Sequence, residues 1–211
     1  MIIIETQEKY DFSVDWFAPN IPVWDMFLPQ FNPKKILEIG AYEGRSTCYL
    51  IEKFGQIRQL EIHCVDSWEG GVEHDKSAMS SVEQRFDKNT RLAIKNALYP
   101  VSLVKHKKYS NIALAELIAG GHTSNFDVVY VDGSHQAPDV LSDAVMSFPL
   151  LRVGGLMIFD DYLWSVDEMG KQDPFKMPKP AIDAFLNLYQ RKMQVVRGAP
   201  VYQLYATKVG P

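Results

Sequence analysis

The sequence predicts an α/β fold, a three-layer αβα sandwich built on a doubly wound, seven-stranded and mostly parallel sheet. Short apolar runs alternate with stretches of helical spacing, and buried strands joined by crossover helices form parallel sheets. The last two runs are separated by a short turn at 198–200, which favours an antiparallel C-terminal hairpin. With 46% hydrophobic and 23% charged residues, the 211-residue chain has the composition of an ordinary globular domain.

Each expected strand is a short run rich in apolar and β-branched residues. These runs are 36–39, 60–65, 101–104, 126–131, 156–159, 193–196 and 201–206. The expected helices are 46–54, 113–118, 140–151 and 180–191, and helix-like spacing also occurs within 69–98.

The first 33 residues differ from the rest, because they are rich in aromatic residues and proline. Proline interrupts helices, so residues 1–33 are expected to form an irregular cap that packs its rings on the main domain, residues 34–211. Such a cap either covers a substrate or seals one end of the sheet. Both parts are expected to form a single globular domain.

Charge and cysteine content exclude several classes of protein. The chain has 22 basic and 26 acidic residues, a net charge of −4, which favours neither nucleic acid nor an anionic membrane as a partner. No apolar run approaches the roughly 18–20 residues of a membrane span. The two cysteines, Cys48 and Cys64, are too few for a zinc site or a disulfide scaffold, which favours a cytoplasmic location.

A glycine turn follows the first expected strand and contains Gly40, Ala41, Tyr42 and Gly44. It lacks the second glycine of a dinucleotide fingerprint, where Tyr42 stands instead, and it lacks the lysine of a P-loop. The turn therefore favours a nucleoside-like ligand without phosphates. Glu38, inside the strand, needs a partner because a buried carboxylate is costly alone. Either an amino group of the ligand or local N–H groups would supply that partner.

The second expected strand ends at Asp66, 28 residues after Glu38. An acid at this position can accept hydrogen bonds from both hydroxyls of a ribose. Trp68, two residues later, is placed to lie against a base, and Ser67 between them belongs to the same predicted site.

The segment 38–44, the acid at Asp66 and the final hairpin resemble class I S-adenosylmethionine-dependent methyltransferases. Within that family the chain is similar to bacterial small-molecule O-methyltransferases, including sugar O-methyltransferases, over residues 34–208. The resemblance implies strand order 3-2-1-4-5-7-6, with S-adenosylmethionine across the first two strands. It also implies that Gly40, Ala41, Tyr42 and Gly44 line the methionine part, that Ser46 opens the next helix, and that Tyr109 and Ser110 lie near the adenine.

Acidic residues follow the fourth and fifth expected strands: Asp132, Asp160 and Asp161. Like charges held close need a cation or a proton between them, and an all-oxygen cluster suits Mg²⁺. These positions match the cation-binding acids of metal-dependent catechol-type and sugar O-methyltransferases, and Asp132 also borders the cofactor. His135 stands where the catechol type has a catalytic lysine, so His135 or Asp132 is the expected general base. The acids could instead cap the following turns, as in metal-free relatives.

The resulting hypothesis is an S-adenosylmethionine-dependent methyltransferase that O-methylates a small hydroxylated metabolite, a sugar or a phenol, with help from Mg²⁺. The group also suggests a homodimer. A metal-independent methyltransferase, a nicotinamide-binding enzyme and a non-catalytic protein on the same type of sheet remain alternatives.

Overall fold

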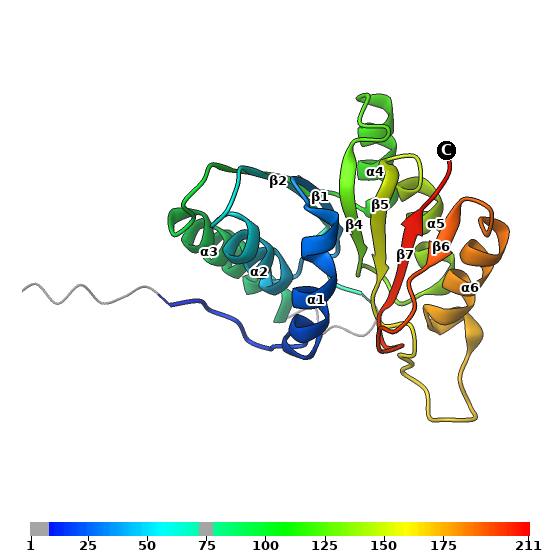
Figure 1. The fold of residues 1–211 in the computed structure, drawn as a ribbon. Coiled ribbons are helices and arrows are strands. Elements are labelled where there is room, and N and C mark those ends of the chain that lie inside the picture. The colour runs from blue at the N-terminus through cyan, green and yellow to red at the C-terminus, as the bar shows by residue number, and fades with distance from the viewer. Residues whose placement is uncertain (1–8, 72–77) are drawn as a thin grey trace, which may run out of the picture.

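The computed structural model describes residues 9–71 and 78–211 and has the predicted three layers, with the sheet between helices on both faces (Figure 1). The seven strands form one sheet of order β3-β2-β1-β4-β5-β7-β6, as the resemblance implies. The strands are β1 Lys35–Ile39, β2 Leu60–Asp66, β3 Val101–Lys107, β4 Phe126–Val131, β5 Leu151–Phe159, β6 Met193–Val195 and β7 Leu204–Lys208. Strands β3, β2, β1, β4 and β5 pair in parallel, whereas β7 pairs antiparallel with both β5 and β6.

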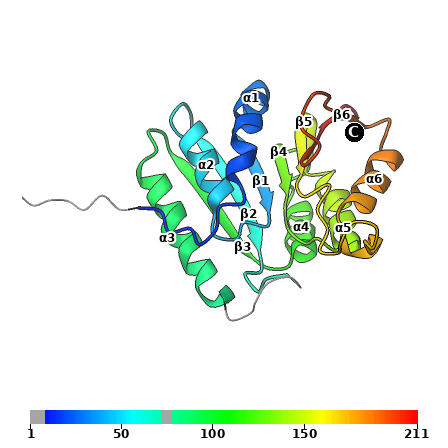
Figure 2. The same ribbon diagram turned by 90° about the horizontal axis from the view of Figure 1, so that it is seen from below.

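Helices α1, α2 and α3 cover one face of the sheet, and α4, α5 and α6 cover the other (Figure 2). The helices are α1 Ile21–Phe31, α2 Arg45–Phe54, α3 Val82–Lys95, α4 Ser110–Ala119, α5 Ala137–Ser147 and α6 Lys179–Leu188. Three short 3-10 helices are η1 Ala18–Asn20, η2 Ala78–Ser81 and η3 Pro174–Lys176. Within the described residues, no helix has both the length and the apolarity that crossing a membrane requires. The helical spacing noted in 69–98 is confirmed by α3, whereas residues 72–77 lie outside the described residues.

Successive residues of the central strand β1 contribute to opposite cores, as the alternation of side chains along a strand requires. Ile36 packs in the cluster that contains Trp24 of α1, while Leu37 and Ile39 pack in the cluster that contains Phe185 of α6. Both faces of the strand are therefore buried, which explains why its residues other than Lys35 and Glu38 are apolar.

The expectation that the N-terminal cap is irregular is wrong for residues 21–31, which form α1. Pro22 lies in the first turn, where a backbone N–H has no partner within the helix, and therefore costs nothing there. Pro29 lies in the last turn, and the helix ends two residues later at Phe31, followed by Asn32 with a left-handed φ of +50°. Trp24 and Leu28, four residues apart and both 0% exposed, supply the buried stripe that holds the helix on the sheet.

The C-terminal hairpin is confirmed, but its connection is longer than the predicted turn at 198–200. Met193 pairs with Lys208 and Val195 with Ala206, so residues 196–203 form the loop. The strand predicted at 201–206 is β7 and begins at Leu204 instead, because Val201, Tyr202 and Gln203 leave the sheet and run past the end of β5.

Candidate functional site

The glycine turn at residues 40–44 lies at the carboxyl ends of β1, β2 and β4. The N–H of Gly40 donates to the carbonyl oxygen of Val65 at 2.8 Å, and the N–H of Asp132 donates to that of Ile39 at 2.8 Å. Gly40 has a φ of +83°, and a Cβ built on it would lie 1.9 Å from the carbonyl oxygen of Asp132. Only glycine fits this position, because both the conformation and the space exclude a side chain.

Asp66 holds the glycine turn against the end of β2. Its Oδ2 accepts hydrogen bonds from the N–H groups of Ala41 and Tyr42, both at 2.9 Å. Its Oδ1 accepts the N–H of Trp68 at 2.7 Å. Each carboxylate oxygen has two lone pairs, so Oδ1 retains capacity for one more donor. The predicted ribose acid therefore also determines the shape of the turn.

Glu38 lies beneath the glycine turn and is 0% exposed. Its carboxylate accepts hydrogen bonds from the hydroxyls of Ser46 and Thr47 in the first turn of α2, and the thiol of Cys64 lies at 3.4 Å. Burial raises the pKa of Glu38 to about 7, although these hydrogen bonds act in the opposite direction. In this arrangement Glu38 connects the strand to the start of α2. Ser46, predicted to open the next helix, is the second residue of α2 after Arg45 and is engaged inside the protein by Glu38.

An open pocket of about 420 Å³ lies beyond the end of β2 and is lined by Trp68, Glu69, Gly70, Met79, Ser80 and Tyr109. The indole N–H of Trp68 donates to the carbonyl oxygen of Tyr42 at 2.9 Å, which connects the pocket to the glycine turn. Ser67 accepts the N–H of Glu69 within the loop. Ser110 begins α4 next to Tyr109, and its hydroxyl contacts the buried carboxyl of Asp143.

The acids that follow β4 and β5 meet around one phenol. The hydroxyl of Tyr130 donates to Asp160 and lies 2.8 Å from Oδ2 of Asp132. Burial and the neighbouring carboxylates raise the pKa values of Asp132 and Asp160 above the usual range, Asp132 most strongly. Asp160 is only 9% exposed, and its Oδ1 accepts the N–H of Asp161 at 2.7 Å.

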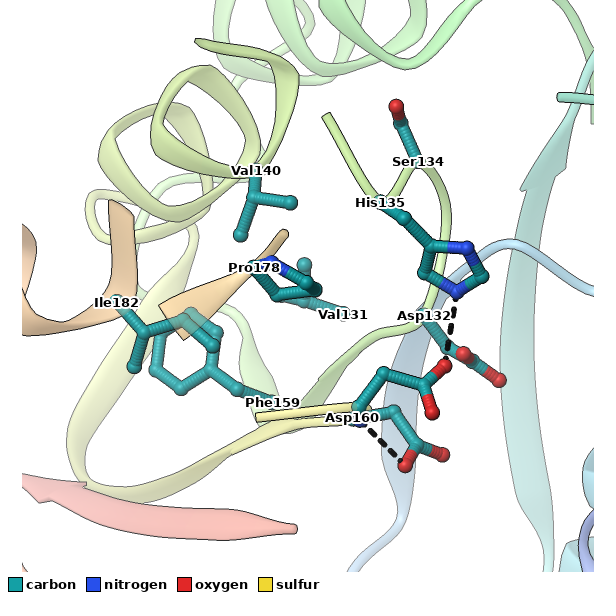
Figure 3. Close-up of a pocket in the computed structure, with 10 residues that line it drawn as sticks. Val131, Asp132, Ser134, His135, Val140, Phe159, Asp160, Pro178 and Ile182 are labelled. Atoms are coloured by element: carbon teal, nitrogen blue, oxygen red, sulfur yellow. Dashed lines mark hydrogen bonds and ion pairs between the residues drawn. The ribbon is translucent and has the colours of Figure 1, made fainter. Parts of the chain in front are cut away.

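His135 reaches the same cluster from the loop after β4 (Figure 3). Its Nε2 lies 2.9 Å from Oδ2 of Asp161, and its ring stacks on Trp164 with centroids 4.0 Å apart. The hydroxyl of Tyr202 donates to the other oxygen of Asp161 at 2.8 Å. Figure 3 also shows that a small pocket beside the acids is closed by apolar side chains, among them Val140 and Ile182.

Among the described residues, no group of three or more His, Cys, Asp or Glu side chains is arranged as a metal site. The composition of the cluster does fit a hard divalent cation, since Asp132, Asp160 and Asp161 offer only oxygen donors. Among the residues that the structure describes, no lysine or arginine forms an ion pair with any of these three carboxylates. In the described part of the chain, His135 is therefore the basic side chain that contacts this cluster of carboxylates, and it faces Asp161.

A sequence profile described as "Methyltransferase domain" matches residues 37–162, more than half of the chain and the part that carries the glycine turn and the acids. The chain belongs to the methyltransferase domain family. With its strand order, this methyltransferase has the class I fold that the resemblance implied. Among curated proteins, an uncharacterized protein of Acanthamoeba polyphaga mimivirus is 24% identical over 155 residues, which are 66% of this chain and 63% of that protein. The chain thus spans less than two thirds of this relative.

Solved structures similar to this methyltransferase include two enzymes of natural-product synthesis. The O-methyltransferase TomG from Streptomyces achromogenes, in complex with S-adenosylmethionine, is 17% identical with a TM-score of 0.59, covering 95% of this chain and 83% of TomG. The MycE methyltransferase of the mycinamycin pathway, in complex with Mg and S-adenosylhomocysteine, is 19% identical with a TM-score of 0.55, covering 94% of this chain and 51% of MycE. At these identities the likeness concerns the fold alone.

The structure of this methyltransferase also brings to the site residues that the sequence analysis missed. Tyr130 links the acids, Tyr202 contacts Asp161, and Gln203 donates to Asp160 from the loop before β7. The hydroxyl of Thr47 donates a hydrogen bond to the carboxylate of Glu38, as the hydroxyl of Ser46 does. For Tyr130, a local signal was present in the sequence: a polar side chain inside an otherwise apolar strand could have marked it as a site residue.

Proposed function

We propose that this protein is an S-adenosylmethionine-dependent O-methyltransferase of a small hydroxylated metabolite, with a sugar as the first candidate and a phenol as the second. One observation carries the proposal: the glycine turn packs directly on the backbone of Asp132, the first residue of the acid cluster. A methyl donor in the turn and an acceptor at the acids would therefore be neighbours.

The cofactor would occupy the carboxyl ends of β1 and β2. Gly40, Ala41, Tyr42 and Gly44 would border its methionine part, and Asp66 would use the remaining lone pair of Oδ1 for a ribose hydroxyl. The adenine would enter the pocket between Trp68 and Tyr109, with Ser67 and Ser110 at its edge. Glu38 and Ser46 would act from beneath, by holding the turn and the start of α2 in one geometry.

Asp132, Asp160 and Asp161 would hold a Mg²⁺ ion, which suits their oxygen donors. Bound there, the cation would lower the pKa of an acceptor hydroxyl and orient it.

His135 is proposed as the general base, with Asp132 as the alternative. Nε2 faces Asp161, whose carboxylate would stabilise the imidazolium that forms when the ring takes the proton. Stacking on Trp164 limits rotation of the ring and so maintains its direction. Methyl transfer to an oxygen needs alignment and exclusion of water more than covalent participation of the protein.

Calorimetric titration with S-adenosylmethionine, S-adenosylhomocysteine and NAD, with and without Mg²⁺, tests the proposal. The first two compounds should bind and NAD should not; absence of any affinity for the first two refutes the proposal. Asp160→Asn and His135→Gln should leave cofactor affinity within about twofold while lowering turnover of an accepted substrate at least about 100-fold. His122→Gln, outside the cluster, is the matched control and should keep full turnover.

A metal-independent methyltransferase is the second candidate, supported by the lack of an assembled metal site among the described residues. Full activity of the purified enzyme in excess chelator would favour it over the first. The cytoplasmic location and the homodimer stay predictions.

A further inference from the structure

A buried chain of hydrogen bonds connects the N-terminal helix α1 to Asp160. The indole N–H of Trp24 donates to Oε1 of Gln203 at 2.8 Å, and the hydroxyl of Tyr205 donates to the same oxygen. The amide nitrogen of Gln203 donates to Oδ2 of Asp160 at 2.8 Å. Trp24, Gln203 and Tyr205 are 0%, 3% and 2% exposed, so water does not compete for these bonds.

The direction of this chain follows from the chemistry of its first member. An indole nitrogen donates and never accepts, so the oxygen of the Gln203 amide must face Trp24. The amide NH₂ group then faces Asp160 and can only donate to it. Tyr130 donates to the same Oδ2, and the N–H of Asp161 donates to Oδ1. Donors on both oxygens determine the plane of the carboxylate.

Packing alone does not explain these side chains. The ring of Trp24 contacts the rings of Phe17, Tyr49 and Tyr130, and a phenylalanine could make similar contacts. A buried glutamine is costly unless its amide is paired, so a purely structural position would favour an apolar residue. Here both the oxygen and the nitrogen of the Gln203 amide are hydrogen-bonded, and the nitrogen donates to Asp160 of the acid cluster.

We propose that Gln203 is a positioning residue for Asp160 and that Trp24 acts through Gln203, which makes helix α1 part of the site rather than only a cover for the sheet. The role of Asp160 as a cation ligand rests on the proposed function. Partners that orient a ligating carboxylate typically change metal affinity about 10–100-fold.

Gln203→Leu and Trp24→Phe test the proposal, with Tyr49→Phe as the matched control. Tyr49 also packs on Trp24, but its hydroxyl donates to Asp25 and not to the chain. Mn²⁺ affinity, measured by electron paramagnetic resonance without substrate, should fall about tenfold or more in Gln203→Leu and in the same direction in Trp24→Phe. The control should bind Mn²⁺ as wild type does, and all should bind S-adenosylmethionine within about twofold of wild type. Trp24→Phe retains a ring in the core and provides the readout if Gln203→Leu does not fold.

Equal Mn²⁺ affinity of wild type and both variants overturns the proposal. If wild type itself binds no Mn²⁺, the metal part of the proposed function fails, and a crystal structure of Gln203→Leu or Trp24→Phe decides the inference separately. A rotated Asp160 carboxylate supports the positioning role, and an unmoved one refutes it.

Discussion

Tyr130 has one hydroxyl hydrogen and faces two carboxylates, those of Asp132 and Asp160. A single hydrogen cannot satisfy both acids when both are ionised and withdrawn from water. Asp160 also accepts hydrogen bonds from the N–H of Asp161 and the amide of Gln203, so the shortage of donors falls on Asp132. We expect a proton or a bound cation to supply what Asp132 lacks.

Gly40→Ala should destabilise the protein by about 3 kcal/mol or more, because a Cβ meets the Asp132 backbone in a left-handed conformation. Denaturant titration measures the loss. Gly121→Ala is the matched control, since Gly121 has a similar φ of +82° but nothing within 4 Å of a built Cβ. Gly121→Ala should lower the free energy of unfolding by about 1 kcal/mol, because only the strain of the left-handed conformation applies there. Equal losses in the two variants would contradict the steric argument.

Among the elements, the segment before α1 is attached to α2 and α3 by polar contacts around Glu43, which is 1% exposed. Its carboxylate accepts the N–H and the hydroxyl of Ser13 at 2.6 and 2.7 Å, and the guanidinium of Arg85 at 2.7 Å. The side-chain amide of Asn89 donates to the carbonyl oxygens of Glu43 and Asp11. The segment is thus bound to the turn that precedes α2.

Glu43→Ala should release residues 9–20 from the domain, because Ser13 and Arg85 lose their shared acceptor. Limited proteolysis should then cleave this segment several-fold faster than in wild type, while the rest of the chain stays resistant. Glu116→Ala removes an exposed acid that pairs with Lys108, far from Ser13 in the sequence, and should leave the cleavage rate unchanged. Unchanged cleavage in Glu43→Ala would show that apolar packing alone holds the segment.

Over the whole molecule, the two cores share one sheet, and α1 completes the core on one face. Trp24 and Leu28 pack in the same cluster as Tyr130 and Ile158 of the central strands. Because the described part of the cap packs in the same cluster as the central strands, we expect the composition change at residue 33 not to divide the protein into two folding units.

Thermal unfolding should therefore be one cooperative transition, with equal calorimetric and van't Hoff enthalpies. Trp24→Ala should lower the stability of the entire molecule by about 3–5 kcal/mol, because it leaves a cavity between α1 and the sheet. Trp16→Ala is the control, since Trp16 is 64% exposed, and it should have little effect. A separate early transition of the N-terminal region would contradict the single-domain prediction.

Much of the fold could be predicted because its signals are local. The parallel strands are buried on both faces and so read as apolar runs, and β4 was predicted at 126–131 with its observed bounds. Helix α1 could not be predicted from proline content, because Pro22 lies in the first turn, where its cost is small, and Pro29 lies inside the helix, a position where proline is disfavoured. The start of β7 differs from the predicted position because Val201 and Tyr202 have strand propensity but lie in the loop.

The sequence by itself determined the carboxyl ends of β1, β2, β4 and β5, and with them the positions of the glycine turn, Asp66 and the three acids, because periodicity and strand termini depend on neighbouring residues. Only the tertiary structure decided which groups these acids contact. Gln203 lies 43 residues from Asp160 and 179 from Trp24, and the three meet because the sheet places β7 beside β5 and α1 across its face. Hydrogen-bond partners at such separations follow from strand order and packing, which no local pattern encodes.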